Sequence, residues 1–122
     1  MKRNIILVSL LVIAIGGIGY LIVSSFGTND QVDVWIAVDS DGNFVPSDIT
    51  IKKGTVVGWL NEREEDIWPA SNLHPSHLVY SEFDPLGPIA PGDSWSFKFN
   101  KRGDWRFHDH LNPIKTGIVV VE

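Results

Sequence analysis

The residues best suited to chemistry in this sequence are four histidines that fall in two close pairs. One pair stands in the segment HPSH, and the other flanks an aspartate in FHDH. Imidazole nitrogens bind Cu(II), Zn(II) and Ni(II), and the usual order of affinity favours copper. Side chains two residues apart on a strand project to the same side, so the second pair can converge on one ion. The predicted metal ligands are His74, His77, His108 and His110.

The predicted ion is copper, as Cu(II), with zinc or no metal as the alternatives. The sequence leaves open which of His74 and His77 is a ligand, because a histidine in a proline-rich loop can also be a solvated or capping residue. His108 and His110 have a structural alternative, a hydrogen-bonded corner formed with nearby aspartates. The side chains placed to fix the imidazole tautomers are Asn72, Asp104, Asp109 and Asn112.

Other kinds of site find little support in the sequence. The chain has no cysteine, so it offers neither a thiolate ligand nor a disulfide. It shows no nucleophilic triad, no phosphate-binding glycine loop and no pair of acids in a glycosidase context. An enzymatic role is therefore the less favoured interpretation.

Residues 1–28 are predicted to form a membrane anchor that spans the bilayer once. After Lys2 and Arg3, the stretch from Ile5 to Val23 has 19 residues without a charge. As a helix it would span roughly 28 Å, enough for the hydrocarbon core of a bilayer. A cleaved signal peptide is the alternative, since Val23 and Ser25 suit its small-residue cleavage rule. In either case the rest of the chain is expected on the extracytoplasmic side, periplasmic or extracellular.

Residues 29–122 are predicted to be one exported domain. They hold all 15 acids and eight of the ten bases, which gives them a formal charge of −7. That charge argues against nucleic acid or anionic lipid as a partner of the domain. The expected partners are the membrane, through the N-terminal helix, a metal ion, and a redox or envelope protein.

The exported domain is predicted to be an all-β, antiparallel Greek-key sandwich. Apolar and polar residues alternate in QVDVWIAV and SWSFKF, and further short apolar runs lie at 48–60 and 117–121. Gly and Pro turns separate these runs without a helical period, a pattern typical of a small sandwich or barrel. Trp59, Trp95 and Trp105 stand at strand spacing and are predicted to lie in the core.

One long segment, 62–91, interrupts the strand pattern. It carries five of the seven prolines and the HPSH pair. A loop of this length in a small domain is usually functional or disordered. Its aromatic residues Trp68, Tyr80 and Phe83 favour packed structure. For Trp68 two roles stay open, shielding a site from water and marking a docking surface.

The order of motifs in residues 32–122 resembles a cupredoxin domain of the plastocyanin and azurin type. FVPSDITIKKGTVVGWLN is similar to the first half, with an aromatic-x-Pro, an Ile-x-Ile, a Gly and a Trp-x-Asn. IAPGDSWSFKFNKRGDWRFHDHLNPIKTGIVVVE is similar to the second half, from a Pro-Gly turn to a closing Gly-x-Val-x-Val strand. The resemblance implies a Greek-key sandwich whose ligands come from the middle of the chain and from the loop before the last strand.

The ligand positions of a blue-copper cupredoxin are largely replaced in this sequence. The resemblance places the mid-chain histidine at His77, with His74 as its rival. The cysteine position falls on Asp109, the second histidine on Asn112 and the methionine on Lys115. Since blue colour and fast electron transfer depend on a Cu–S bond, the resemblance implies the fold without a blue-copper site.

The His-x-His motif resembles one in multicopper oxidases, where such histidines line a copper cluster between two cupredoxin domains.

The sequence features together are consistent with three functions. The favoured one is a membrane-anchored, cupredoxin-like protein that binds copper through histidines for copper handling or electron transfer. The second is a metal-free binding or structural module, which predicts an exposed apolar patch around Trp68, Tyr80 and Phe83. The third is a subunit of a small multicopper oxidase-like enzyme built from two copies.

Overall fold

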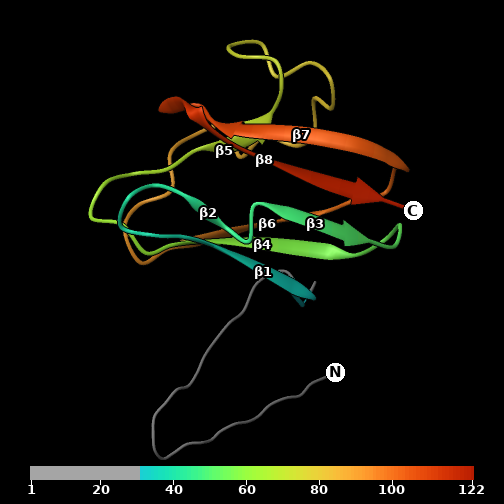
Figure 1. The fold of residues 1–122 in the computed structure, drawn as a ribbon, viewed down its shortest axis with the longest axis horizontal. Helices are drawn as coiled ribbons and strands as arrows, with labels where there is room; N and C mark the ends of the chain where they lie inside the picture. The colour runs from blue at the N-terminus through green and yellow to red at the C-terminus, as the bar shows by residue number, and fades with distance from the viewer. Residues whose placement is uncertain (1–30) are drawn as a thin grey trace, which may run out of the picture. The chain divides into compact units, whose positions relative to one another are not determined.

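Two β-sheets make up residues 31–122, the part of the chain that the computed structural model describes (Figure 1). The strands of this part are β1 (Val34–Val38), β2 (Phe44–Val45), β3 (Asp48–Ile51), β4 (Val56–Asn61), β5 (Pro69–Ser71), β6 (Ser94–Lys98), β7 (Gly103–Asp109) and β8 (Asn112–Val121). The anchor predicted at residues 1–28 lies outside the described range. Within that range, no helix has the length and apolar character needed to cross a membrane.

Each sheet has four strands, in the orders β2-β1-β4-β6 and β3-β8-β7-β5. This confirms the predicted all-β sandwich. The expectation of purely antiparallel pairing is wrong at two places, because β1 pairs with β4, and β3 with β8, in parallel. The chain crosses to the other sheet between the members of each parallel pair. Alternation of apolar residues reports which face of a strand is buried and carries no information on the direction of its neighbour.

The core lies between the two sheets, and Trp59 of β4 is the largest fully buried side chain of the described residues. The centroid of its ring lies 5.2, 5.5 and 5.6 Å from those of Phe83, Trp95 and Phe107. Trp95 and Trp105 are half-buried and pack against this core, in agreement with the sequence prediction. Aromatic side chains bury large apolar areas, so this cluster is a main source of stability in so small a domain.

A close contact between β7 and β8 positions the strand that leads to the second histidine pair. Phe107 of β7 lies opposite Gly117 of β8, and its ring rests on the glycine backbone. A Cβ atom at Gly117 would collide with that ring and would lie 2.5 Å from the carbonyl oxygen of Ser47. The absence of a side chain there lets Phe107 pack inward directly before His108.

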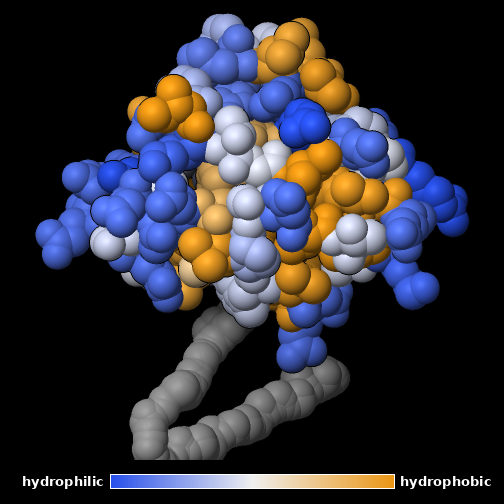
Figure 2. Space-filling view, viewed as in Figure 1, coloured by the Kyte–Doolittle hydropathy of each residue, from blue (hydrophilic) through white to orange (hydrophobic). Residues whose placement is uncertain are grey.

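The long segment between β4 and β6 is packed, as predicted. It contains β5, which pairs with β7, and an isolated bridge between Ile67 and Ile89. Tyr80 and Phe83 are buried, so the patch expected of a metal-free module is not formed around them. Figure 2 instead shows hydrophobic surface at the top of the view, where the loop after β5 lies in Figure 1. The exposed apolar residues of this loop include Leu73, Leu78, Val79 and Leu86.

Candidate metal centre

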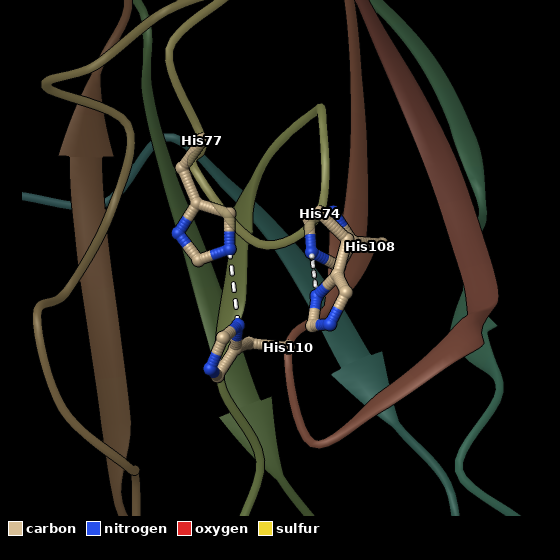
Figure 3. A group of neighbouring side chains, drawn as sticks. All are labelled: His74, His77, His108 and His110. Carbon is tan, nitrogen blue, oxygen red and sulfur yellow. Dashed lines mark hydrogen bonds between the residues drawn. The ribbon is translucent and has the colours of Figure 1, made fainter.

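Two neighbouring strands bring the histidine pairs to one end of the second sheet. His108 lies in β7, and His110 follows the last residue of that strand. β5 runs antiparallel beside β7, with Pro69 opposite Asp109 and Ser71 opposite Phe107. The loop that leaves β5 folds back and brings His74 and His77 next to the histidines of β7 (Figure 3). The backbone N–H of His110 donates to the carbonyl oxygen of Trp68 at 2.8 Å, which ties the turn after β7 to the start of β5.

The four imidazoles point toward one another (Figure 3). One ring nitrogen from each histidine lies within 4.8 Å of those of the other three. Nδ1 of His74 lies 3.3 Å from Nε2 of His108, and Nε2 of His77 lies 3.1 Å from Nδ1 of His110. Four nitrogens at about 2.0–2.1 Å from one tetrahedral ion would be separated by roughly 3.3 Å. Two of the observed separations match this spacing, and the fold gathers all four predicted ligands of one chain into a single cluster.

Two hydrogen bonds from outside the cluster determine which nitrogen His77 and His108 present. Nδ1 of His77 lies 2.7 Å from Oδ2 of Asp84, and Nδ1 of His108 lies 3.0 Å from Oδ1 of Asn72. Both oxygens are acceptors, so Nδ1 carries the proton in each ring and Nε2 presents a lone pair to the cluster. Metal-ligating histidines are commonly oriented by such bonds.

Asp84 is the functional side chain that the sequence did not reveal. Its Oδ1 accepts hydrogen bonds from Nε1 of Trp68 and from the backbone N–H of Leu86, both at 2.8 Å. Burial disfavours its charged form, yet the hydrogen bonds from His77, Leu86 and Trp68 lower the pKa of Asp84 below the usual value of its carboxyl. No strand or helix period relates Asp84 to His77, so only the folded loop reveals their contact.

The four histidines differ in their exposure to water. His77 and His108 are 4% and 2% exposed, whereas His110 is half-buried and His74 is exposed. Burial, together with the three neighbouring imidazoles, lowers the pKa of His108 to about 4. Burial, with His77 and His74, also lowers the pKa of His110. These two rings are neutral near pH 7, which is the state in which imidazole binds a metal.

Trp68 covers one side of the cluster. The centroid of its ring lies 4.6 Å from that of His110. Its Nε1–H donates to Asp84, the same carboxylate that orients His77. One half-buried indole thus packs on one imidazole and braces the acceptor of another, which agrees with the shielding role expected of Trp68.

Comparisons with known proteins bear on the fold. No protein-family profile matches the chain, and no curated protein does. Among solved structures, a novel purple cupredoxin from Nitrosopumilus maritimus is similar with a TM-score of 0.64 and 22% identity, over 74% of this chain and 100% of the other. Amicyanin from Paracoccus versutus is similar with a TM-score of 0.64 and 19% identity, over 79% of this chain and 86% of the other. The chain has the cupredoxin fold.

In this cupredoxin fold, a buried aspartate stands at the position to which the resemblance assigns the blue-copper cysteine. Oδ1 of Asp109 accepts hydrogen bonds from the backbone N–H groups of Trp68 and Leu111, both at 3.0 Å. The side chain is fully buried, and its Oδ2 has no hydrogen-bond partner among the described residues. The carboxylate therefore braces the turn between His108 and His110 against the start of β5.

The other replaced positions also stay apart from the imidazoles. Nζ of Lys115 donates to Oδ1 of Asn43 at 2.8 Å. Of the side chains expected to hold the imidazole tautomers, Asn72 does so. Within residues 31–122, no hydrogen bond joins an imidazole to the other three, which are Asp104, Asp109 and Asn112.

The ligand atoms that the cupredoxin domain offers decide which kinds of metal site it can form. A blue-copper group does not fit, because the chain has no cysteine to supply the thiolate. Four imidazole nitrogens suit Cu(II) and Zn(II), and two of them already present lone pairs to the cluster. The histidine cluster is thus a candidate metal centre with nitrogen ligands alone.

Proposed function

We propose that residues 31–122 form a copper-binding domain in which four histidines hold Cu(II) without a thiolate. The observation that carries this proposal is the convergence of their four ring nitrogens within 4.8 Å of one another. The outer hydrogen bonds on two of the rings are of the kind that orients metal ligands. The usual affinity order places Cu(II) above Zn(II) and Ni(II) at such a site. The proposed ligands are His74, His77, His108 and His110.

The protein's part in this chemistry is to present neutral nitrogens and to limit the access of water. Copper, when bound, would supply Lewis acidity and redox activity. Asp84 and Asn72 keep the proton on Nδ1 of His77 and His108, so that Nε2 of each ring stays available. Trp68 covers one side of the cluster by packing on the imidazole of His110.

Copper handling is the role that the donor set favours. Fast electron transfer at a blue-copper site depends on the Cu–S bond, which this chain cannot form. Imidazole ligands suit Cu(II), so the domain is best suited to hold and pass on that ion. Electron transfer is the alternative, and the cupredoxin fold is the observation that supports it.

The same proposal places the domain outside the cytoplasm. Residues 1–28 act as its membrane anchor, and residues 29–122 lie on the periplasmic or extracellular side. The support is the uncharged stretch from Ile5 to Val23, preceded by Lys2 and Arg3. Carbonate extraction of membranes from cells that make the full chain should leave it in the pellet, and protease added from outside should remove the domain. Release of the chain by carbonate would contradict the anchor.

A Cu(II) titration of the full chain in mild detergent, read by electron paramagnetic resonance, tests the metal site. We expect stoichiometric binding with nitrogen hyperfine structure and no intense blue band. The signal should disappear in the double variant His108→Ala/His110→Ala and persist in the control Asp104→Asn, which changes an exposed residue of β7. If the native chain binds no copper, or if the double variant keeps the signal, the domain is a metal-free cupredoxin scaffold whose role depends on a protein partner.

A further inference from the structure

Three of the four histidines are held by groups outside the cluster. His77 bonds to Asp84 at 2.7 Å, and His108 bonds to Asn72 at 3.0 Å. Both rings are almost completely buried. Neither can leave the cluster without leaving a cavity behind and breaking its hydrogen bond to Asp84 or Asn72. Each is therefore a fixed part of the site.

The third held ring belongs to His110. Trp68 packs on it with a centroid distance of 4.6 Å, and the backbone N–H of His110 donates to the Trp68 carbonyl at 2.8 Å. Asp109 bonds to the backbone on both sides of this contact, at Trp68 and at Leu111. The backbone and the ring of His110 are thus restrained together.

His74 differs from the other three in every one of these respects. It is exposed to water, and its neighbours Leu73 and Pro75 are exposed too. Among the described residues, the only hydrogen-bond partner of its ring is the His108 imidazole, at 3.3 Å. Rotation of this ring into water breaks no hydrogen bond to a residue outside the cluster.

We infer that His74 is the exchangeable ligand of the histidine centre, the position at which an incoming nitrogen or anionic donor takes over the metal ion. This inference rests on the proposed function, since it requires that the cluster binds Cu(II). In the exchange the bond from copper to His74 breaks and a bond from copper to the incoming donor forms. The oxidation state stays the same, and the freed imidazole remains in water. His77, His108 and His110 keep the ion in place meanwhile.

Azide and imidazole, as the anionic and the neutral donor, test the inference on the copper-loaded full chain. The number of coordinating histidines is counted by pulsed electron paramagnetic resonance on protein labelled with ¹⁵N-histidine. We expect azide or imidazole to reduce that number by one in the native chain. In His74→Ala the number should already be reduced, and added azide or imidazole should leave it unchanged. Persistence of all four histidines in the native chain at saturating azide and imidazole would overturn the inference.

Release of Cu(II) to excess chelator gives a second, kinetic measurement. We expect the His74→Ala variant to bind Cu(II) and release it about tenfold faster than the native chain, because differences in affinity appear chiefly in the dissociation rate. The matched variant His77→Ala removes a held ligand and should weaken binding much more. Equal losses in the two variants would contradict a special role for His74. A native chain that binds no Cu(II) at all would refute the proposed function itself, an outcome distinct from four-histidine binding that azide and imidazole cannot alter.

Discussion

Oδ2 of Asp84 lies 2.7 Å from Nδ1 of His77, and this contact decides which side of the imidazole faces the other histidines. The carboxylate is itself fixed by Trp68 and by the Leu86 backbone, so it cannot turn away. A carboxylate that accepts the Nδ1 proton leaves Nε2 as a lone-pair donor. The loop after β5 therefore carries both a candidate ligand and the group that orients it.

Replacement of Asp84 by Asn is expected to lower the affinity for Cu(II) by roughly ten- to a hundredfold. The amide has no charge, and it can turn its NH₂ group toward His77 and favour the opposite tautomer. Competition with a chelator of known affinity measures the change. The control Glu82→Gln removes an exposed carboxylate from the same loop and should leave the affinity unchanged. Equal losses in both variants would mean that the general negative charge of the loop matters rather than the bond to His77.

The metal-free domain is expected to lose stability as the pH falls from about 6.5 to about 4. A histidine in the unfolded chain titrates near 6.5, whereas the pKa of His108 in the fold is about 4. Between these values the unfolded chain binds a proton that the folded chain does not, so acid favours unfolding. The lowered pKa of His110 acts in the same direction.

The thermal unfolding midpoint, measured across that pH range without metal, tests this expectation. The variant His108→Gln lacks the group whose pKa is lowered most clearly, so its midpoint should fall less on acidification. An identical pH dependence in the variant and the native chain would assign the acid sensitivity to other groups.

Binding of Cu(II) is expected to quench the fluorescence of Trp68 more than that of the other tryptophans. The centroid of its ring lies 4.6 Å from that of His110, which places it beside the proposed ion. In Trp68→Phe the fraction of emission lost on copper addition should fall. The control Trp35→Phe changes a half-exposed indole on β1 of the other sheet and should show undiminished quenching. Quenching that is unchanged in Trp68→Phe would place the copper elsewhere.

Gly117→Ala is expected to destabilise the domain by about 1–3 kcal/mol, the usual effect of overpacking. The added methyl group would meet the Phe107 ring and the Ser47 carbonyl oxygen. Urea unfolding gives the free-energy difference. Gly87→Ala is the matched control, because a Cβ there has no neighbour within 4 Å. A variant at Gly117 as stable as the control would show that β7 and β8 can separate without loss.

Much of the fold could be predicted from local patterns. The alternation in 31–38 and 94–99 marks strands with one buried face, and Ile36, Val38 and Phe99 are indeed buried. The parallel pairings of β1 with β4 and of β3 with β8 could not be predicted this way. They arise because the chain changes sheets between those strands. Alternation of apolar residues shows which face of a strand is buried, but it does not show which strand pairs with it or in which direction.

For the candidate site too, some features could be predicted from the sequence and others depend on the tertiary structure. The sequence by itself determined the chemistry of the donors, since four histidines and no cysteine limit any metal centre to nitrogen and oxygen ligands. It also placed His108 and His110 on one side of a strand end, because that follows from a two-residue spacing. Only the tertiary structure decided that His74 and His77 join them, that Asp84 and Asn72 orient two of the rings, and that His74 is left exposed. The loop that carries these residues has no period of its own, so its path depends on the burial of Tyr80 and Phe83 against strands distant in the sequence.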